Sequence, residues 1–158
     1  MTPPKTILAA ALGVAICSLS VSANAQTPTC EGTPGPARLL IDISGMTSTR
    51  GEMSASLYPG DKSQFLIKNG ALKVWYAPVT SPETHMCIWL KAPGTYALSI
   101  YHDANSNHKL DVSPFSNSER IGFSNNPKVF WAKPSYESAK FTAKAGDTTL
   151  HINLVTGK

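Results

Sequence analysis

The chain has 158 residues, of which 42% are hydrophobic and 15% are charged, and its formal net charge is +4. This length fits one domain, the hydrophobic fraction excludes a disordered chain, and the sparse charge excludes a coiled coil. A charge this small attracts polyanions only weakly, and the sequence contains no nucleic-acid-binding motif, so we expect no nucleic-acid partner.

Residues 1–25 have the layout of a secretory signal peptide. Lys5 precedes an apolar stretch over residues 7–21, and Ala23 and Ala25 place small side chains just before a signal-peptidase cleavage site. The apolar stretch is shorter than the roughly 20 residues that a membrane span needs. We therefore expect cleavage after Ala25, and a mature chain that is periplasmic or extracellular and does not span a membrane.

The expected mature chain keeps two of the three cysteines, Cys30 and Cys87. An oxidising compartment favours a disulfide between them; two free thiols or a metal pair are the alternatives, although two isolated cysteines make a poor zinc site. A bridge from residue 30 to residue 87 spans 57 positions and would contribute about 4 kcal/mol on the loop-entropy model. It would attach an N-terminal arm, residues 26–37, to a single domain over residues 38–158.

Alternation of apolar and polar residues with a period of two predicts an all-β domain. Turns containing Pro, Gly and Ser separate the strands, and Asp61 caps the one predicted helical turn, which includes Phe65 and stops at Asn69. About seven strands with mostly short turns indicate a β-sandwich. The predicted strands span residues 38–44, 52–58, 72–78, 84–90, 94–101, 137–143 and 148–154.

Residues 102–134 form one long polar loop without an obvious strand, and loops of this length are commonly functional. Oxygen-bearing side chains stand at spacings typical of positions one, three, five and nine of a calcium loop, whose tight turn points alternate side chains inward. A backbone carbonyl can supply a further oxygen. The candidate calcium ligands are Asp103, Asn105, Asn107, Asp111 and, through its backbone, Lys109.

Two positions of this loop depart from the calcium-loop pattern. His108 stands where the sharp turn usually has Gly, and Pro114 stands where a Glu usually completes the site. The alternative interpretation is a network of Asx turns, in which Asn and Asp side chains bond their own backbone. Calcium is the one cofactor that the sequence suggests. A calcium site predicts that the melting temperature rises with calcium, whereas an Asx-turn network predicts no change.

The segment from Gly122 to Asn126 resembles the start of a hydrolase nucleophile elbow around Ser124. The final Gly of that motif is replaced by Asn126, however, and no helix pattern follows. A structural role is the favoured interpretation, in which Gly122, Asn125 and Asn126 adopt left-handed backbone and close a turn beneath Phe123. We therefore predict no catalytic residue here.

Histidines and aromatic residues have simple structural interpretations. The histidines could bind a transition metal, but their scattered placement favours strand or surface positions. The aromatic residues could form a stacking platform for sugars, but a sandwich of this size needs some of them in its core. The residues concerned are His85, His102, His108, His151, Trp75, Trp89, Trp131, Tyr76 and Tyr101.

Four short motifs follow one another in the chain: Ala92-Pro93-Gly94-Thr95-Tyr96-Ala97, Tyr101-His102-Asp103-Ala104-Asn105, Gly122-Phe123-Ser124-Asn125-Asn126 and Pro134-Ser135-Tyr136-Glu137. In this order they resemble the uncharacterised bacterial family named domain of unknown function 2141. The resemblance extends over nearly all of residues 38–155. It implies an exported β-sandwich, related in shape to immunoglobulin-like and transthyretin-like folds, with no established activity. The family pattern His-Asp-x-Asn-x-Asn-Gly-x-x-Asp falls on residues 102–111, with His108 in place of the Gly.

Together these observations predict an exported, non-catalytic β-sandwich that serves as a binding or structural module of the cell envelope. Envelope proteins and cell-surface polymers are the expected partners. Three alternatives remain: a calcium-stabilised adhesion or accessory module, a serine hydrolase using Ser124, and a carbohydrate-binding module with exposed aromatic rings.

Overall fold

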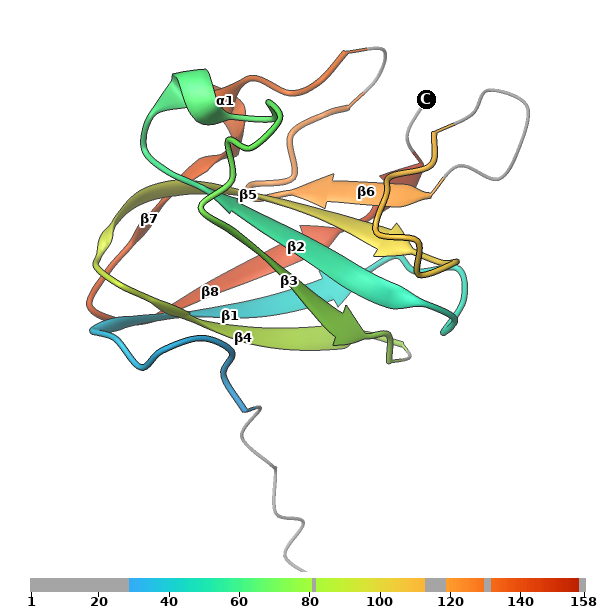
Figure 1. Ribbon diagram of the computed structural model, residues 1–158, viewed down its shortest axis with the longest axis horizontal. Coiled ribbons are helices and arrows are strands. Elements are labelled where there is room, and N and C mark those ends of the chain that lie inside the picture. The colour runs from blue at the N-terminus through green and yellow to red at the C-terminus, as the bar shows by residue number, and fades with distance from the viewer. Residues whose placement is uncertain (1–28, 81, 113–118, 130–131, 157–158) are drawn as a thin grey trace, which may run out of the picture.

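The computed structural model describes residues 29–80, 82–112, 119–129 and 132–156. The predicted signal peptide, Pro114 and Trp131 lie outside these residues. The described chain forms two β-sheets and two very short helices (Figure 1). Its elements are β1 (Ala37–Ser44), β2 (Glu52–Tyr58), the 3-10 helix η1 (Lys62–Gln64), β3 (Lys73–Pro78), β4 (Thr84–Leu90), β5 (Gly94–Asp103), β6 (Arg120–Phe123), α1 (Tyr136–Ala139), β7 (Lys140–Ala143), β8 (Gly146–Asn153) and β9 (Val155–Thr156).

The smaller sheet has three strands in the order β4-β1-β8. Strand β1 is central, antiparallel to β4 and parallel to β8, so the first and the last long strands of the domain are neighbours. Along β1 every second residue is buried and the residues between are half-buried. This pattern is what the period-two alternation predicts for a strand with one face on the core.

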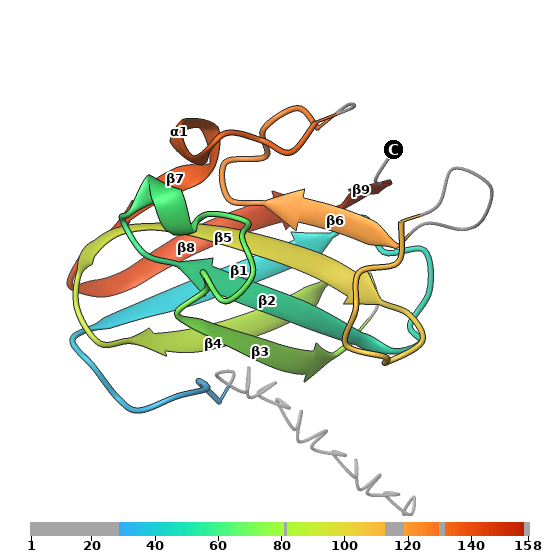
Figure 2. The same ribbon diagram turned by 45° about the horizontal axis from the view of Figure 1, so that its top comes forward.

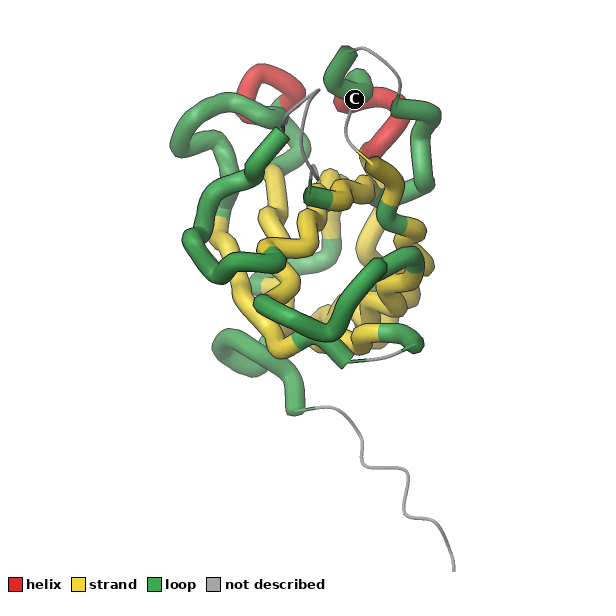
Figure 3. Tube along the Cα trace, turned by 90° about the vertical axis from the view of Figure 1, so that its right-hand side faces the viewer, coloured by secondary structure: helices red, strands yellow, loops and turns green. Residues whose placement is uncertain are grey.

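The larger sheet contains six strands, ordered β3-β2-β5-β6-β9, with β7 also paired to β5. Strand β5 organises this sheet. One of its edges pairs with β2 over residues 97–103, and the other pairs with β7 in its first half and with β6 in its second. Figure 3 shows the strands in a compact stack, with both helical segments on the same side of it.

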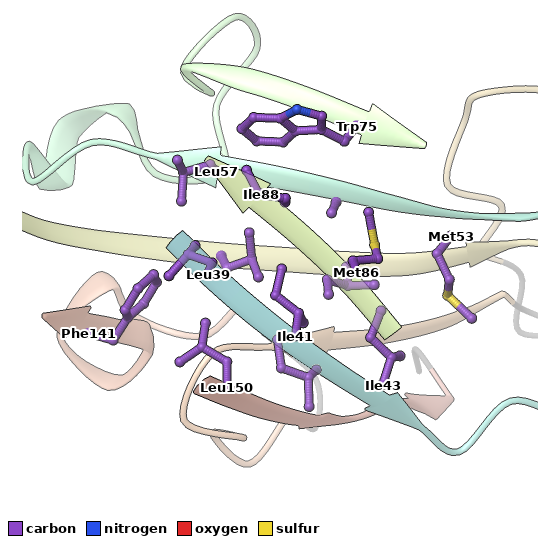
Figure 4. Packing of buried hydrophobic residues seen from close by; sticks show 14 of the residues in the cluster. Leu39, Ile41, Ile43, Met53, Leu57, Trp75, Met86, Ile88, Phe141 and Leu150 are labelled. Carbon is purple, nitrogen blue, oxygen red and sulfur yellow. The ribbon is translucent and has the colours of Figure 1, made fainter. Parts of the chain in front are cut away.

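The main core lies between the two sheets. Leu39, Ile41 and Ile43 of β1 point into it and are at most 1% exposed, and side chains from both sheets surround them (Figure 4). Full burial of one such aliphatic side chain contributes about 1.5–3 kcal/mol relative to leaving it exposed. Trp75 of β3 is buried in the same cluster, as core packing of the aromatic residues predicts.

A second, smaller cluster lies on the other face of the larger sheet, beneath the two short helices (Figure 2). Phe65 is its centre, with edge-to-face ring contacts to Tyr58, Phe123 and Tyr136 at centroid distances of 5.2, 6.4 and 5.8 Å. The segments after β2, after β6 and before β7 are therefore packed together on one face of the sheet.

The all-β sandwich predicted from the sequence is confirmed, with nine strands among the described residues where about seven were expected. Strands β6 and β9 were missed, because four and two residues are too short to show a period. Residues 137–143 do not form one strand: Ser135 accepts a hydrogen bond from the Ser138 N–H and caps the single turn of α1 before β7 begins. The predicted helical turn after Asp61 is present as η1, where the Asp61 side chain accepts from the Ser63 N–H. Its predicted continuation through Phe65 to Asn69 is wrong, because Phe65 has extended backbone and η1 ends at Gln64.

Cys30 and Cys87 are joined by a disulfide, as expected. The adjacent Glu31 lies beside β4 as an isolated parallel bridge to Ile88. Its N–H donates to the carbonyl of Cys87 at 2.7 Å, and its carbonyl accepts from the Trp89 N–H at 2.9 Å. The N-terminal arm therefore covers the free edge of β4, which a disulfide alone would not achieve.

Candidate functional site

The predicted calcium loop begins where β5 ends, at Asp103, and emerges from one end of the larger sheet (Figure 1, right-hand side). Asp103 is completely buried. Its carboxylate accepts the backbone N–H of Asn107 at 3.1 Å and that of His108 at 2.6 Å. The loop is therefore folded around a buried negative charge whose position is set by the last residue of a strand.

Asn105 and Asn107 continue this pattern of side-chain-to-backbone hydrogen bonds. The Asn105 Oδ1 accepts from the Asn107 N–H at 3.1 Å, and the Asn107 Oδ1 accepts from the Lys109 N–H at 2.8 Å. Both amide nitrogens donate to the same carboxylate oxygen of Asp111, at 2.9 Å each. The Asx-turn network that the sequence allowed is thus present, and it draws the four candidate side chains into one loop.

The sequence analysis missed Glu119, which completes this loop. Its side chain is largely buried, and its two carboxylate oxygens accept the N–H groups of Ala104 and Asp111 at 3.0 Å each. Burial raises the pKa of Glu119, and the nearby charges of Asp103 and Asp111 add to this effect against its two backbone hydrogen bonds. Glu119 lies five residues beyond residue 114, where a standard calcium loop has its final Glu, so the loop pattern gives no signal for it.

The donor atoms of this loop are oxygens, which hard cations such as Ca²⁺ prefer. Within the described ranges, no three His, Cys, Asp or Glu side chains lie close enough together to hold a metal ion. A calcium site here consequently needs the amide oxygens of Asn105 and Asn107. In the present arrangement the oxygens of Asn105 and Asn107 accept backbone N–H groups and their nitrogens donate to Asp111, so these side chains would have to rearrange to bind calcium.

His108 occupies the position where the calcium-loop pattern has Gly. Its φ is 59°, in the left-handed region that Gly adopts most easily. The His108 ring stacks on Tyr76 of β3 at 4.3 Å, and its Nε2 lies 2.7 Å from a carboxylate oxygen of Glu52. These contacts hold a non-Gly residue in the sharp turn and attach the loop to the larger sheet.

His102 supports the same end of the sheet from the inside. It is 2% exposed, and its Nε2 lies 2.7 Å from the carbonyl oxygen of Arg50, so that nitrogen carries the proton. The neighbouring Gly51 has a φ of 76°, and a Cβ there would overlap the carbonyl of Asp103. The loop between β1 and β2 thus packs directly against the start of the candidate site.

Ser124, the candidate nucleophile of the hydrolase alternative, is completely buried. Its hydroxyl accepts the Leu98 N–H at 2.9 Å and donates to the carbonyl of Ala139. Both bonds are structural, because they connect β5, the end of β6 and α1. A substrate could reach this oxygen only if the surrounding strands separated.

The backbone around Ser124 differs from the expectation at one residue. Asn125 and Asn126 have φ values of 64° and 47°, in the left-handed region, but Gly122 does not have a positive φ, and that part of the prediction is wrong. Gly122 is required for a different reason, because a Cβ there would lie 2.6 Å from Cγ2 of Ile152.

The remaining predicted candidates lie apart from this loop. His85 and His151 both contact Asp42 on the outer face of the smaller sheet, with Nδ1-to-carboxylate distances of 2.7 and 3.1 Å. Their proximity was not foreseen, because it depends on the register of three strands. Trp89 lies beneath the Arg38 guanidinium, 5.2 Å from it, and so is not part of an exposed row of rings with the buried Trp75.

Comparisons with known proteins identify one match. A family model described as "Uncharacterized protein conserved in bacteria (DUF2141)" matches residues 41–151, from within β1 to within β8. No curated protein and no solved structure matches the chain. Among the described residues, no helix is long and apolar enough to cross a membrane.

Proposed function

The chain belongs to the DUF2141 family of uncharacterised bacterial proteins, and we propose that it is an exported binding or structural module of the cell envelope, stabilised by calcium. The observation that carries this proposal is the loop in which the carboxylates of Asp103, Asp111 and Glu119 and two Asn side chains share one hydrogen-bond network.

Electrostatics support a cation in this loop. Asp103 and Glu119 are both largely buried, and the charges of Asp103 and Asp111 oppose ionisation of Glu119. A divalent cation would offset this repulsion, while the amide and backbone oxygens of the loop would complete its coordination. Asp103, Asn105, Asn107, the Lys109 carbonyl and Asp111 are the residues that would hold it, and Glu119 would fix the loop around them through its bonds to the Ala104 and Asp111 N–H groups.

Export is supported by the layout of residues 1–25 and by the disulfide between Cys30 and Cys87, since disulfides persist in oxidising compartments. A binding role is favoured over hydrolysis, because Ser124 is buried and both of its hydrogen bonds are structural. It is also favoured over sugar stacking, because Trp75 is buried in the core.

The test uses the full chain expressed in a bacterium and purified from the periplasmic fraction. Mass spectrometry should find an N-terminus at Gln26, and thermal unfolding should then be measured after removal of metal and again in millimolar calcium. A ligand that binds only the folded state stabilises it by about 2.7 kcal/mol at one hundred times its dissociation constant. We therefore expect a clear increase in melting temperature with calcium.

Variants assign this increase to the loop. Asp111→Asn and Glu119→Gln should abolish the calcium response, whereas Glu137→Gln, which removes an exposed carboxylate from α1, should leave it unchanged. Absence of any response in the native protein would contradict the calcium proposal and leave a metal-free Asx-turn loop. Retention of the protein in the cytoplasm with residues 1–25 intact would contradict export.

A further inference from the structure

The outer face of the larger sheet carries a groove of about 500 Å³, a volume typical of small-molecule sites. Its floor consists of side chains that point away from the main core on three adjacent strands. Ser56 and Ser99 are partners in the register of β2 and β5, between the larger Tyr58 and Tyr101. Two small side chains between two rings leave a hollow in the floor, which Ile121 and Phe123 of β6 extend.

Described residues of three loops form the walls of the groove: residues 66–68, residues 110 and 112, and residue 129 with residues 132–134. The course of the described parts of these loops can be followed in Figure 2. Ile67, Leu110 and Val112 lie on these walls and are 51%, 43% and 51% exposed. They are three of the six large hydrophobic side chains that the described residues expose. Apolar side chains gathered around one hollow indicate a binding site, whereas scattered ones do not.

The wall near Ile67 is held in a fixed shape. Leu66 has a φ of 55°, which is unusual for a bulky residue. Its side chain packs against the cluster around Phe65, and its carbonyl accepts a hydrogen bond from the Lys133 Nζ at 3.3 Å. Two of the three walls are therefore connected, and the groove is formed before any ligand arrives.

The charges on the groove are all of one sign. Among the described residues that line it, Lys68 and Lys133 are charged and none is Asp or Glu. Lys68 follows Leu66 by two residues, and Lys133 is bonded to the Leu66 carbonyl, so both cations lie where these two walls meet. The rest of the lining is dominated by apolar and aromatic side chains. This arrangement complements a molecule with an apolar chain and one anionic end.

We propose that this groove binds a single-chain anionic amphiphile, such as a long-chain carboxylate, with its charged end at Lys68 and Lys133 and its chain over the floor between Tyr58 and Tyr101. Such a ligand would cover the exposed apolar side chains of the walls. Leu110 of the calcium loop lies on one wall, but neither lysine nor any floor residue belongs to that loop, so this inference does not require calcium to bind.

Binding can be measured by calorimetry on the purified protein, with decanoate, decyl phosphate, decyltrimethylammonium and acetate kept below micelle-forming concentrations. We expect saturable binding of one anionic amphiphile per chain, and the tighter of the two anionic probes identifies the preferred end group. The cationic probe should bind about tenfold more weakly or worse, and acetate, which lacks the chain, should not bind. Equal binding of the cationic and anionic probes would overturn the proposal.

Variants locate the site. The double variant Lys68→Glu/Lys133→Glu should weaken decanoate binding by about tenfold or more, and Ser99→Phe should abolish it by filling the hollow. Lys144→Glu, in the turn between β7 and β8, is the matched charge control and should bind normally. Melting temperatures close to native would show that the variants are folded.

Amide chemical shifts give a second readout that does not depend on variants. Decanoate should shift the backbone amides of Ser56 and Ser99, and shifts confined to another surface would overturn the proposal. Decanoate titrations in EDTA and in calcium separate the two proposals. Binding of decanoate under both conditions supports the groove, even if calcium does not raise the melting temperature. A groove found buried in a stable dimer of this chain would also overturn it.

Discussion

At the scale of single residues, the positions that decide the fold are those where a strand or loop has no spare room. Gly122 lies in β6, opposite Ile100 of β5, and faces the main core. A Cβ at this position would lie 2.6 Å from Cγ2 of Ile152 and 3.0 Å from Cδ2 of Leu154. The close approach of β6 to the C-terminal strands therefore requires Gly, although its backbone φ is ordinary.

Gly122→Ala should destabilise the protein by about 1–3 kcal/mol, the usual cost of forcing an extra methyl group into a packed core. Urea denaturation measures this loss. Gly146→Ala is the control, because Gly146 has a φ of 81° and nothing within 4 Å of its would-be Cβ, so that only backbone strain of about 1 kcal/mol is expected there. If Gly122→Ala cost no more than a few tenths of a kcal/mol, the packing explanation would be wrong.

His108 adopts the backbone conformation that the calcium-loop pattern usually assigns to Gly. The sharp turn of the loop needs left-handed backbone, and His108 adopts it with a φ of 59°. Stacking on Tyr76 and the 2.7 Å contact between its Nε2 and the Glu52 carboxylate hold it there. Histidine is also among the residues that tolerate this region best. The lack of Gly at position 108 therefore does not prevent the sharp turn of this loop.

At the scale of elements, the N-terminal arm is the part of the fold that depends most on one covalent bond. Glu31 makes two backbone hydrogen bonds to β4, and the neighbouring disulfide holds it in place. A strand edge covered in this way is protected from pairing with another chain. The arm therefore behaves as a short extra strand of the smaller sheet.

Reduction of the disulfide should lower the free energy of unfolding by about 4 kcal/mol, because the 57-residue separation no longer restricts the unfolded chain. Amide hydrogen exchange should accelerate first at Glu31 and Trp89, whose N–H groups make the bonds between the arm and β4. A Cys30→Ser/Cys87→Ser variant should match the reduced protein and be insensitive to reductant. Uniform acceleration across β1 and β5, without priority at the arm, would contradict this account.

At the scale of the whole molecule, the fold is closed by strands from the two ends of the domain. β1 and β8 pair in parallel, and the side chains of Arg38 and Asp147 form two hydrogen bonds of 2.7 Å across this pair. Leu150, Ile152 and Leu154 enter the core from the C-terminal side. The main core is therefore incomplete until β8 and Leu154 have packed against it.

A chain ending at residue 145 should lack a cooperative unfolding transition, because β1 loses its parallel neighbour and the core loses three aliphatic side chains. Near-ultraviolet circular dichroism and urea denaturation test this. A chain ending at residue 154 is the matched control: it loses only β9, which pairs with β6 at two positions, and should unfold cooperatively. Cooperative unfolding of the shorter chain would show that the first seven strands form a core by themselves.

The sequence alone determined what depends on local pattern. The alternation of Leu39, Ile41 and Ile43 predicts a strand with one buried face, Asp61 predicts the cap of a helical turn, and residues 103–111 predict a turning loop rich in oxygen ligands. The pairing of Cys30 with Cys87 followed from their number and the expected compartment. Each of these inferences needs only neighbouring residues or a count.

The tertiary structure decided everything that depends on which distant segments meet. Glu119 joins the loop of residues 103–111 because β6 returns beside β5, and His85 and His151 meet at Asp42 because three strands share a register. The groove exists because two serines, 43 positions apart in the chain, face each other between three loops. Strand register sets these contacts, and hydrophobic periodicity carries no information about register between strands far apart in the sequence.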